Sequence, residues 1–310
     1  MTETLDDNAR WSAATPVLSV LMPFLRDDPR DLLLALDREA AVLDGGVEIV
    51  ILDDGTCDAN LTQALKQVTA SMNMPVRLIT LATNAGRAVG RNILAQAARG
   101  GSLLFLDSDM RPDSDRFLTA WADLVRRDDP PVAFGGFSLL QAPTDSRFAV
   151  HRAMATKSDC IPCAERALTP EKYVYTSNLL VRRDVFDSEA FDADFSGWGW
   201  EDVEWAMRVS RRFPVLHIDN PATHMGLDTT EALAGKYEQS AGNFARVIAK
   251  HPDIIATYPS FKAARLLKRM PMLGAIRPWI KKVAMTGWLP TATRAFSLRL
   301  YRATLYADAV

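Results

Sequence analysis

The sequence predicts an α/β fold, with a mostly parallel central sheet flanked by helices. Apolar runs of strand length alternate with segments of helical periodicity four times before residue 110. Two of those runs end in acidic residues, a pattern typical of sheets that bind ligands at their carboxyl edge. The chain has 310 residues, 48% hydrophobic and 24% charged, which suits one large α/β domain with an appendage or two modest domains.

The first 110 residues carry the clearest alternation. Buried strands are predicted for the four apolar runs, at 17–24, 47–54, 76–82 and 102–109. Helices are predicted where apolar residues recur at helical spacing, at 28–43, 58–72 and 88–100. Residues 1–16 are polar and acidic, and we expect them to form a flexible lead-in.

The second half is less regular. The patterns predict five elements: a helix at 114–127, a strand at 132–140, a strand entering a helix at 173–186, a helix at 201–212 and a strand at 214–219. Residues 141–172 show no periodicity and are expected to form a mobile loop, and 220–226 a short one. From Thr229 onward the chain is predicted to be helical, with breaks at Pro252, Pro259, Pro271, Pro278 and Pro290.

Two predicted strands end in acid pairs. Asp53 and Asp54 close one strand, and Asp107 and Asp109 close another. Because the carboxyl ends of parallel strands meet at one edge, both pairs should lie along it. In an extended segment residues i and i+2 point the same way, so Asp107 and Asp109 can converge on Mg²⁺ or Mn²⁺ and bridge it to phosphates. Aspartate also occurs in turns and at helix caps, but its place after an apolar strand favours the metal site.

The segment TNAGRAVGRN, residues 83–92, follows the third predicted strand. Its glycines allow close approach of a ligand to the backbone, and Arg87 and Arg91 can bind phosphate. It matches neither the dinucleotide fingerprint nor a phosphate-binding loop with its lysine. A loop entering a helix, with both arginines in solvent, is the alternative.

The stretch FSGWGWEDVEW, residues 195–205, interleaves tryptophans with acids. Glu201 and Asp202 fall in the first turn of a predicted helix, where the helix dipole favours carboxylates. They could therefore simply start the helix, but that does not explain the preceding GWGW. The two glycines permit unusual backbone conformations, and Trp198 and Trp200 offer flat faces on which sugar rings pack. We therefore predict an acceptor pocket with a catalytic base.

Together these motifs resemble those of glycosyltransferase family 2, on the GT-A fold. The resemblance covers 17–226, about two thirds of the chain. It rests on the order VLSVLMPF, EIVILDDGT, TNAGRAVGRN, SLLFLDSD, SNLLVRR, GWGWEDVEWAMR and a late histidine. The GWGWED stretch also resembles the acceptor-side motif of inverting β-galactosyl- and N-acetylgalactosaminyltransferases. The resemblance implies a Rossmann-like sheet and sugar transfer from a nucleotide-sugar, in most relatives a UDP-sugar.

The resemblance also implies a domain organisation. After the lead-in 1–16, residues 17–228 would form the GT-A catalytic domain. Within it, 17–110 would be the nucleotide-sugar-binding half and 111–228 the acceptor-binding half. Residues 229–310 would be a helical, basic C-terminal extension. The irregular region 141–172 would then shape the choice of acceptor.

On the donor side, five residues match family positions. Asp53 and Asp54 would contact the base and ribose of the nucleotide. Arg87 and Arg91 would lie near the nucleotide, and Asp107 near the ribose and the metal. Together these residues would hold the nucleotide-sugar.

For the metal, the resemblance implies Asp109 as the more direct ligand, together with Asp107. His224 falls just past the strand predicted at 214–219, where several relatives place a further ligand. A lone histidine after a strand is often structural, but imidazole suits Mn²⁺ better than Mg²⁺. The expected cofactor is therefore Mn²⁺ or Mg²⁺.

On the acceptor side, the resemblance makes Asp202 the catalytic base and places Glu201 beside it, gripping the acceptor. Asn178 of SNLLVRR, Trp198 and Trp200 would complete the acceptor site. Asp202 would take the acceptor hydroxyl's proton as its oxygen attacks the anomeric carbon. The nucleoside diphosphate would leave from the opposite face, so one displacement inverts the anomeric configuration. The acceptor would be a glycan, a glycolipid or a polysaccharide precursor.

The charge is unevenly distributed. Residues 260–310 hold ten Lys and Arg but one acid, a net charge of +9, whereas the remainder holds 26 basic and 37 acidic residues, a net charge of −11. Aromatic and aliphatic residues interrupt the basic run, which suits an anionic membrane surface or an acidic partner. A helical extension packed on the body with solvated charges is the alternative. The acidic body argues against a nucleic-acid partner.

Composition also bears on location. No apolar run reaches the length of a membrane span, the polar N-terminus does not resemble a secretory signal, and three cysteines cannot form a dense disulfide framework. We therefore expect a cytoplasmic protein, and the basic tail leaves open a peripheral place on the inner face of the membrane.

Two other functions compete with sugar transfer. A sugar nucleotidyltransferase would carry a glycine-rich basic loop after its first strand, whereas MPFLRDDP stands there, with two acids and no glycine. A non-catalytic carbohydrate-binding protein on the same fold would not need the acids at 107, 109, 201 and 202. The sequence does not exclude it.

Overall fold

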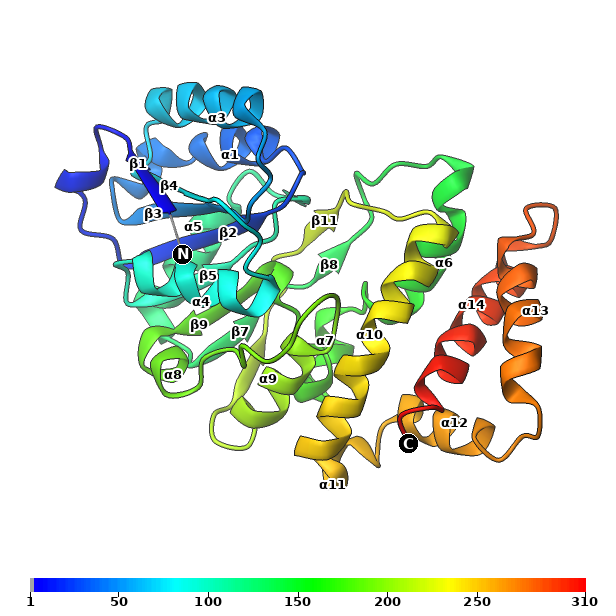
Figure 1. The fold of residues 1–310 in the computed structure, drawn as a ribbon. Helices are drawn as coiled ribbons and strands as arrows, with labels where there is room; N and C mark the ends of the chain where they lie inside the picture. Colours follow the sequence, from blue (N-terminus) through cyan, green and yellow to red (C-terminus); the bar gives the residue numbers. More distant parts are fainter. Residues whose placement is uncertain (1–2) are drawn as a thin grey trace.

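An eight-stranded sheet forms the centre of the computed structural model, which describes residues 3–310 (Figure 1). Its strand order is β1-β4-β3-β2-β5-β9-β7-β10. The strands are β1 (Glu3–Asp7), β2 (Leu18–Phe24), β3 (Val47–Asp53), β4 (Val76–Leu81), β5 (Ser102–Phe105), β7 (Val132–Phe134), β9 (Leu179–Arg182) and β10 (Val215–His217). Strands β4, β3, β2 and β5 pair in parallel, as do β7 and β10, whereas β9 and β1 run antiparallel to their neighbours. The predicted mostly parallel sheet is confirmed.

Both faces of the sheet are covered, which explains the continuous apolar runs of its strands. Along β2, Leu18, Val20 and Met22 join the core on one face, and Leu21 joins the core on the other. Helices α1 (Arg30–Asp37), α2 (Ala40–Leu43), α3 (Ala59–Ser71) and α5 (Phe117–Asp128) pack on the first face. Helices α4 (Arg87–Ala97), α8 (Arg183–Ser188) and α9 (Glu201–Val209) pack on the second.

A small second sheet lies beside the first and differs from the sequence prediction. It consists of β6 (Met110–Pro112), β8 (Phe137–Ser138) and β11 (Ala222–His224), in the order β6-β11-β8. Residues 220–226 were predicted to form a loop, but β11 lies within them. Its antiparallel register sets His224 opposite Met110, one residue after Asp109.

The N-terminal segment is not the flexible lead-in that its polarity suggested. Strand β1 pairs along its whole length with β4, so its exposed polar side chains fit an edge strand. The side chain of Asn8 donates to the carbonyls of Thr69 and Met74 at 3.1 and 2.8 Å. Trp11 is buried, with the guanidinium groups of two arginines over its ring. The side chains of β1 are therefore exposed, as its polar sequence suggests, but the expectation that this segment is flexible was wrong for the described residues from Glu3 onward.

The region 141–172 is also more ordered than expected. It contains α6 (Ala149–Ser158) and α7 (Cys163–Arg166), and the chain's short 3-10 turns are η1 (Trp11–Ala13), η2 (Ser146–Phe148), η3 (Pro170–Lys172) and η4 (Thr176–Asn178). Val150 and Met154 of α6 are buried against the C-terminal helices. The partner surface comes from much later in the sequence, so the local pattern did not show it.

Five helices complete the chain: α10 (Thr230–Lys250), α11 (Pro252–Ile255), α12 (Pro259–Leu267), α13 (Leu273–Met285) and α14 (Thr291–Tyr306). Four of the five predicted proline breaks fall at helix starts or links. Pro278 lies inside α13 instead. Proline has no N–H to donate to the carbonyl of Gly274, four residues earlier, but Gly274 is exposed, so water can satisfy that carbonyl.

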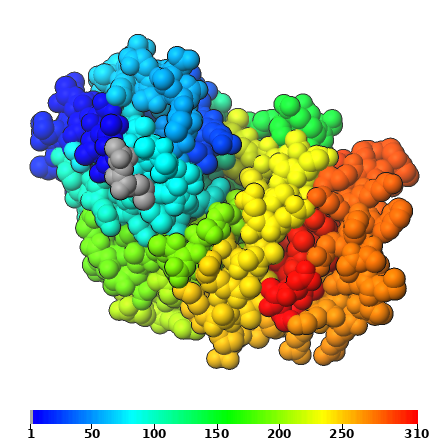
Figure 2. All heavy atoms as spheres, viewed as in Figure 1, coloured from blue at the N-terminus to red at the C-terminus, as the bar shows by residue number. Residues whose placement is uncertain are grey.

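The C-terminal helices pack on the body through two further cores. One joins α6, α10, α13 and α14, and includes Tyr237 and Leu298. The other joins the stretch before α9 to α10, α11 and α14, and includes Phe195, Phe244 and Tyr306. Figure 2 shows these helices at the opposite end of the molecule from the N-terminal strands. No helix within residues 3–310 has both the length and the apolarity to cross a membrane.

Candidate active site

The acid pairs follow β3 and β5, which flank β2 in the sheet. Strands β3 and β4 lie in succession on one side of β2, whereas β5 lies on its other side. Such a reversal of strand order opens a crevice at the carboxyl edge, where ligands bind in sheets of this kind. The predicted donor residues therefore lie where the topology favours a ligand.

Asp54 anchors the next loop instead of facing a ligand. Its carboxylate accepts hydrogen bonds from the backbone of Ala85 at 2.6 Å and Gly86 at 3.1 Å, and from the Asn84 side chain at 2.9 Å. Burial raises the pKa of Asp54. The predicted contact of Asp54 with the nucleotide is thus replaced by a role in shaping residues 83–86. Asp53 is also buried, and it accepts from the Thr56 backbone at 2.8 Å.

Arg91 is a buried bridge between the two acid-bearing segments. Its side chain is 2% exposed, with Nη2 3.0 Å from Asp107 Oδ1 and Nη1 3.3 Å from Glu201 Oε1. It is therefore not free to bind phosphate, contrary to the sequence prediction. Arg87, one helical turn nearer the start of α4, is 45% exposed and lies 3.9 Å from the same Glu201 oxygen. Of the two predicted arginines, Arg87 is the accessible one.

The segment from Asp107 to Asp109 does not have the extended geometry on which their predicted convergence was based. Strand β5 ends at Phe105, and residues 108–109 form a turn in which the Met110 amide donates to the Asp107 carbonyl at 3.1 Å. The extended geometry assumed for residues i and i+2 therefore fails here. Asp107 accepts from Arg91 and, at 2.8 Å, from the Ser177 hydroxyl.

Asp109 pairs instead with His224. The Asp109 Oδ2 lies 3.2 Å from His224 Nε2. A carboxylate and an imidazole that converge suit Mn²⁺, so this pair fits the expected ion. Across residues 3–310, no group of three or more His, Cys, Asp or Glu side chains is arranged to hold a metal.

Two residues that the sequence analysis missed support this pair. A Cβ at position 226 would overlap the Asp109 carboxylate, so Gly226 is required for its close approach. The ring of His151 lies 5.7 Å from that of His224, and its Nδ1 accepts from the Asp228 backbone at 2.8 Å. Burial lowers the pKa of His151 to about 4, so this imidazole is neutral near pH 7. Gly226, two residues after His224, was the one feature of the sequence that could have indicated this support.

The segment before α9 has an unusual backbone. Gly197, Gly199 and Trp200 have φ of 74°, 84° and 77°, and the left-handed conformation costs a non-glycine residue about 1–3 kcal/mol. The Asn243 side chain of α10 donates to the carbonyls of Ser196 and Gly199 at 2.9 and 2.8 Å. The expectation that the glycines permit an unusual backbone is confirmed, and α10 holds it in place.

The two tryptophans differ in their surroundings. Trp200 packs on Phe244, with ring centroids 4.9 Å apart, and its Nε1 donates to the Tyr306 hydroxyl at 3.0 Å. The Trp200 ring, which was predicted to face the acceptor, is part of this aromatic cluster. Trp198 lies 6.0 Å from the Tyr237 ring, is half-buried and has the Lys236 ammonium 5.9 Å above it. Trp198 is therefore the better candidate for an acceptor contact.

Asn178 is fully buried, contrary to a direct role in acceptor binding. Its side-chain amide donates to the carbonyls of Gly136 and Asn220 at 3.0 and 2.9 Å. It joins the end of η4 to neighbouring strands, and its neighbour Ser177 makes the contact with Asp107.

At the start of α9, Asp202 and Glu201 have different environments. Glu201 is almost fully buried beside Arg91, so its carboxylate is held by the protein. Asp202 is partly exposed, and its Oδ1 accepts from the Val203 backbone at 2.8 Å. Burial, followed by the neighbouring charge of Glu201, raises the pKa of Asp202 to about 7. A carboxylate with such a pKa can take up and release a proton near neutral pH.

Residues 19–188, more than half of the chain, match the family model described as glycosyl transferase family 2. The chain belongs to glycosyl transferase family 2. The family match includes Asp53, Asp107 and Asp109 but ends before α9 and β11. The predicted roles of the GWGWED stretch and of His224 therefore rest on the structure and the resemblance alone.

Solved structures show the fold of this family 2 glycosyltransferase. The mannosyltransferase PcManGT from Pyrobaculum calidifontis, in complex with GDP-Man and Mn²⁺, matches with a TM-score of 0.61 at 14% identity, over 97% of this chain and 89% of that one. S. aureus TarS 1-349 in complex with UDP-GlcNAc matches with a TM-score of 0.51 at 15% identity, over 94% and 90%. The predicted GT-A fold with C-terminal helices is confirmed. No curated protein matches the sequence.

Proposed function

We propose that this glycosyltransferase moves a sugar from a nucleotide-sugar to an acceptor hydroxyl with inversion. The observation that carries the proposal is the Arg91 bridge, which ties Asp107 at the donor edge to Glu201, the neighbour of Asp202. The bridge fixes a candidate base relative to the crevice in which the sheet would hold a nucleotide. Partial burial of Asp202 and the charge of Glu201 beside it raise the pKa of this candidate base to about 7, which suits proton transfer near neutral pH.

For the donor we propose a UDP-sugar. The two solved neighbours were crystallised with a UDP-sugar and a GDP-sugar, both nucleoside diphosphate sugars. Asp53 would recognise the base and ribose, because its carboxylate accepts one hydrogen bond, from the Thr56 backbone, whereas that of Asp54 accepts three. Arg87 is exposed beside the crevice and can neutralise a diphosphate.

Asp109 and His224 would hold Mn²⁺ or Mg²⁺, as their 3.2 Å approach and their donor atoms allow. When bound, the ion would offset negative charge on the leaving diphosphate. Gly226 keeps the position beside Asp109 free of side-chain atoms.

In the reaction, the Asp202 carboxylate takes the proton of the acceptor hydroxyl. The acceptor oxygen forms its bond to the anomeric carbon while the bond from that carbon to the diphosphate oxygen breaks on the opposite face. The nucleoside diphosphate leaves with the electron pair, and Asp202 then returns the proton to water. We infer an acceptor that is a glycan, a glycolipid or a polysaccharide precursor, with Trp198 at the edge of its site.

The test is release of nucleotide from UDP-, GDP- and dTDP-sugars, with Mn²⁺, Mg²⁺ or EDTA, by the native chain and by Asp202→Asn. Loss of a general base lowers the rate by about 10²–10⁴-fold, while nucleotide binding should be retained. Asp184→Asn is the matched control, because Asp184 also lies in the first turn of a helix, α8, and its side chain is 64% exposed.

Metal-dependent release from one donor, lost only in Asp202→Asn, would support the proposal. Equal turnover by Asp202→Asn would remove Asp202 as the base. Nucleotide binding without release, even with a range of sugar acceptors, would favour the non-catalytic alternative.

A further inference from the structure

Helix α13 has two apolar faces, and only one of them is covered. Ile280 and Ala284 face the core shared with α10 and α14, and Leu273 at the start of the helix is also buried. About a quarter of a turn around the helix from these residues, four others repeat at intervals of four, three and four positions, which sets them along a second face, with Met272 at the N-cap. These residues form the α13 stripe: Met272, Ile276, Trp279 and Val283.

The stripe is strongly exposed and extends beyond the helix. Met272 is 77% exposed and Trp279 67% exposed, and Trp288, just after α13, is 85% exposed. Met270 before the helix and Leu266 on α12 are also exposed. Single exposed apolar residues are ordinary, but a run of them with two tryptophans indicates a binding surface.

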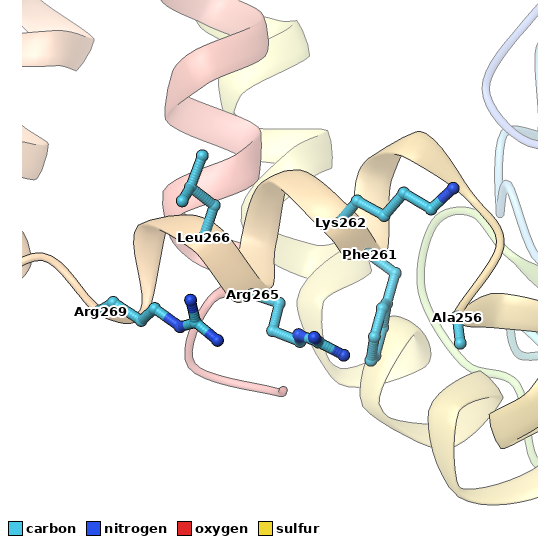
Figure 3. A pocket seen from close by; sticks show the side chains of 6 residues that line it. All are labelled: Ala256, Phe261, Lys262, Arg265, Leu266 and Arg269. Atoms are coloured by element: carbon cyan, nitrogen blue, oxygen red, sulfur yellow. The ribbon is translucent and has the colours of Figure 1, made fainter.

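A basic hollow adjoins this surface. It has a volume of about 300 Å³ and lies along α12 (Figure 3). Its lining is Ala256, Phe261, Lys262, Arg265, Leu266 and Arg269. Figure 3 shows Arg265 beside Phe261, with Arg269 farther along, after the end of α12.

The hollow has no acid in its lining. None of its three cations forms an ion pair with an acid anywhere in residues 3–310. On α13, the Lys282 ammonium lies 5.4 Å from the Trp279 ring, at the flank of the stripe. The positive charge is therefore available to an external anion and lies next to the exposed apolar side chains.

We propose that α12 and α13 dock on an anionic phospholipid membrane. Trp279, Trp288 and the rest of the stripe would enter the interfacial region, where tryptophan is favoured. Lys262, Arg265 and Arg269 would bind lipid phosphates, and Lys282 would add charge at the flank. Charge complementarity selects this occupant, because residues 260–310 carry ten basic residues and one acid, whereas the rest of the chain is acidic.

This binding mode is peripheral, as for an amphipathic helix lying in the membrane surface. It does not depend on the proposed catalytic function, since the docking residues lie on α12, α13 and the link after α13. The readout is binding and needs no donor or acceptor.

The experiment is co-sedimentation of the full chain with vesicles of phosphatidylcholine and phosphatidylglycerol in equal parts, and with phosphatidylcholine alone. Substitutions are preferable to truncation, because α14 belongs to two cores of the body. The apolar variant is Trp279→Ser with Trp288→Ser. The charge variant is Lys262→Gln, Arg265→Gln and Arg269→Gln.

Each variant has a matched control on the body of the protein. Val42→Ser with Leu34→Ser removes two exposed apolar side chains from α2 and α1. Arg116→Gln with Arg147→Gln removes exposed positive charge outside the tail. Circular dichroism and thermal unfolding of every variant establish that it remains folded.

We expect the native chain and both controls to sediment with anionic vesicles, less so at high salt and with phosphatidylcholine alone. Each of the two docking variants should weaken partitioning at least about tenfold, because one loses interfacial tryptophans and the other loses cations that bind lipid phosphates. No binding of the native chain to anionic vesicles at low salt would overturn the proposal and favour an acidic protein partner. Binding by the docking variants equal to that of the controls would also overturn it.

Discussion

The turn after β5 and the start of α9 both carry acids of the site, but the protein positions them by different means. Asp107 and Asp109 follow a central strand, and their partners Arg91, Ser177 and His224 lie on α4, η4 and β11. The start of α9 is held by Asn243, Phe244 and Tyr306, from helices that follow it by tens of residues. The donor edge thus belongs to the sheet, whereas the acceptor side belongs to the C-terminal helices.

This difference changes the meaning of the C-terminal extension. Residues 229–310 were expected as an appendage to a catalytic domain. Through the aromatic cluster around Trp200 and the Asn243 contacts, they instead fix the backbone that precedes Asp202. We infer that the extension is part of the acceptor half of the site, and that Arg91 is the main link between the two halves.

The largest effect is expected from breaking that link. Arg91→Gln would leave Asp107 and Glu201 without their shared cation, and breaking a buried ion pair costs about 3–5 kcal/mol. We expect a drop of this size in the free energy of unfolding by urea, together with loss of turnover.

Arg87→Gln is the control for Arg91→Gln on the same helix. Arg87 is 45% exposed, so its loss should cost less than about 1 kcal/mol of stability and weaken donor binding instead. Equal destabilisation by the two substitutions would contradict the distinction between Arg91 as a buried bridge and Arg87 as a residue that binds the donor.

The next effect isolates the donor edge. In Gly226→Ala the new Cβ would overlap the Asp109 carboxylate and push it away from His224. Changes next to metal ligands typically cost 10–100-fold in affinity, so we expect the Mn²⁺ concentration for half-maximal activity to rise by about that factor. Gly235→Ala on α10 meets no atom within 4 Å and should leave the metal response unchanged.

A smaller effect isolates the acceptor side. Tyr306→Phe removes the hydroxyl that accepts from Trp200 Nε1 and contacts Ser240 at 2.8 Å, at a cost of about 1 kcal/mol. We expect the acceptor KM to rise while the donor KM stays unchanged.

Tyr301→Phe serves as the control for Tyr306→Phe. It removes a hydroxyl on the same helix that donates to Glu238 at 2.6 Å, away from Trp200, so neither KM should move. A donor KM that rises with Tyr306→Phe would show that the two halves are not separable.

The smallest effect concerns pH. Because the pKa of Asp202 is raised to about 7, kcat/KM should increase as pH rises through neutrality and the carboxylate ionises. Glu201→Gln removes a neighbouring negative charge that raises this pKa, so the rising limb should move to lower pH. A limb that stays in place, measured over pH 5–9 with a buffer series, would assign it to another group.

The donor edge was predictable because its signals are local. Apolar runs that alternate with helical segments identified β2, β3, β4 and β5, and the parallel arrangement set their acidic ends along one edge. The predictions that failed there depend on local geometry and pairing. The turn at residues 108–109 replaces the extended geometry assumed for Asp107 and Asp109, and the side chains of Asp54 and Arg91 are bonded to other groups of the protein. A sequence pattern shows where a charged residue lies along the chain, but not which groups it pairs with.

The acceptor side was less predictable because its partners are remote. The GWGW stretch correctly indicated an unusual backbone, but Trp200 turns toward Tyr306, 106 residues away. Helix α6 was missed because its apolar residues pack on α10 and α14. Asn178 resembled a polar site residue, yet three-dimensional neighbours bury it completely.

Strand β1 has a consequence for how copies of this protein meet. It covers the edge of β4, which would otherwise present unpaired backbone groups to other chains. The new edge carries charged side chains, since Asp6 and Asp7 pair with Lys66 and Arg77, and charged side chains disfavour strand pairing between copies. We infer that deleting residues 3–7 would convert a protected sheet into one open to edge-to-edge self-association. Light scattering of the shortened chain would show a rising mass with concentration, and an unchanged monomer mass would contradict the inference.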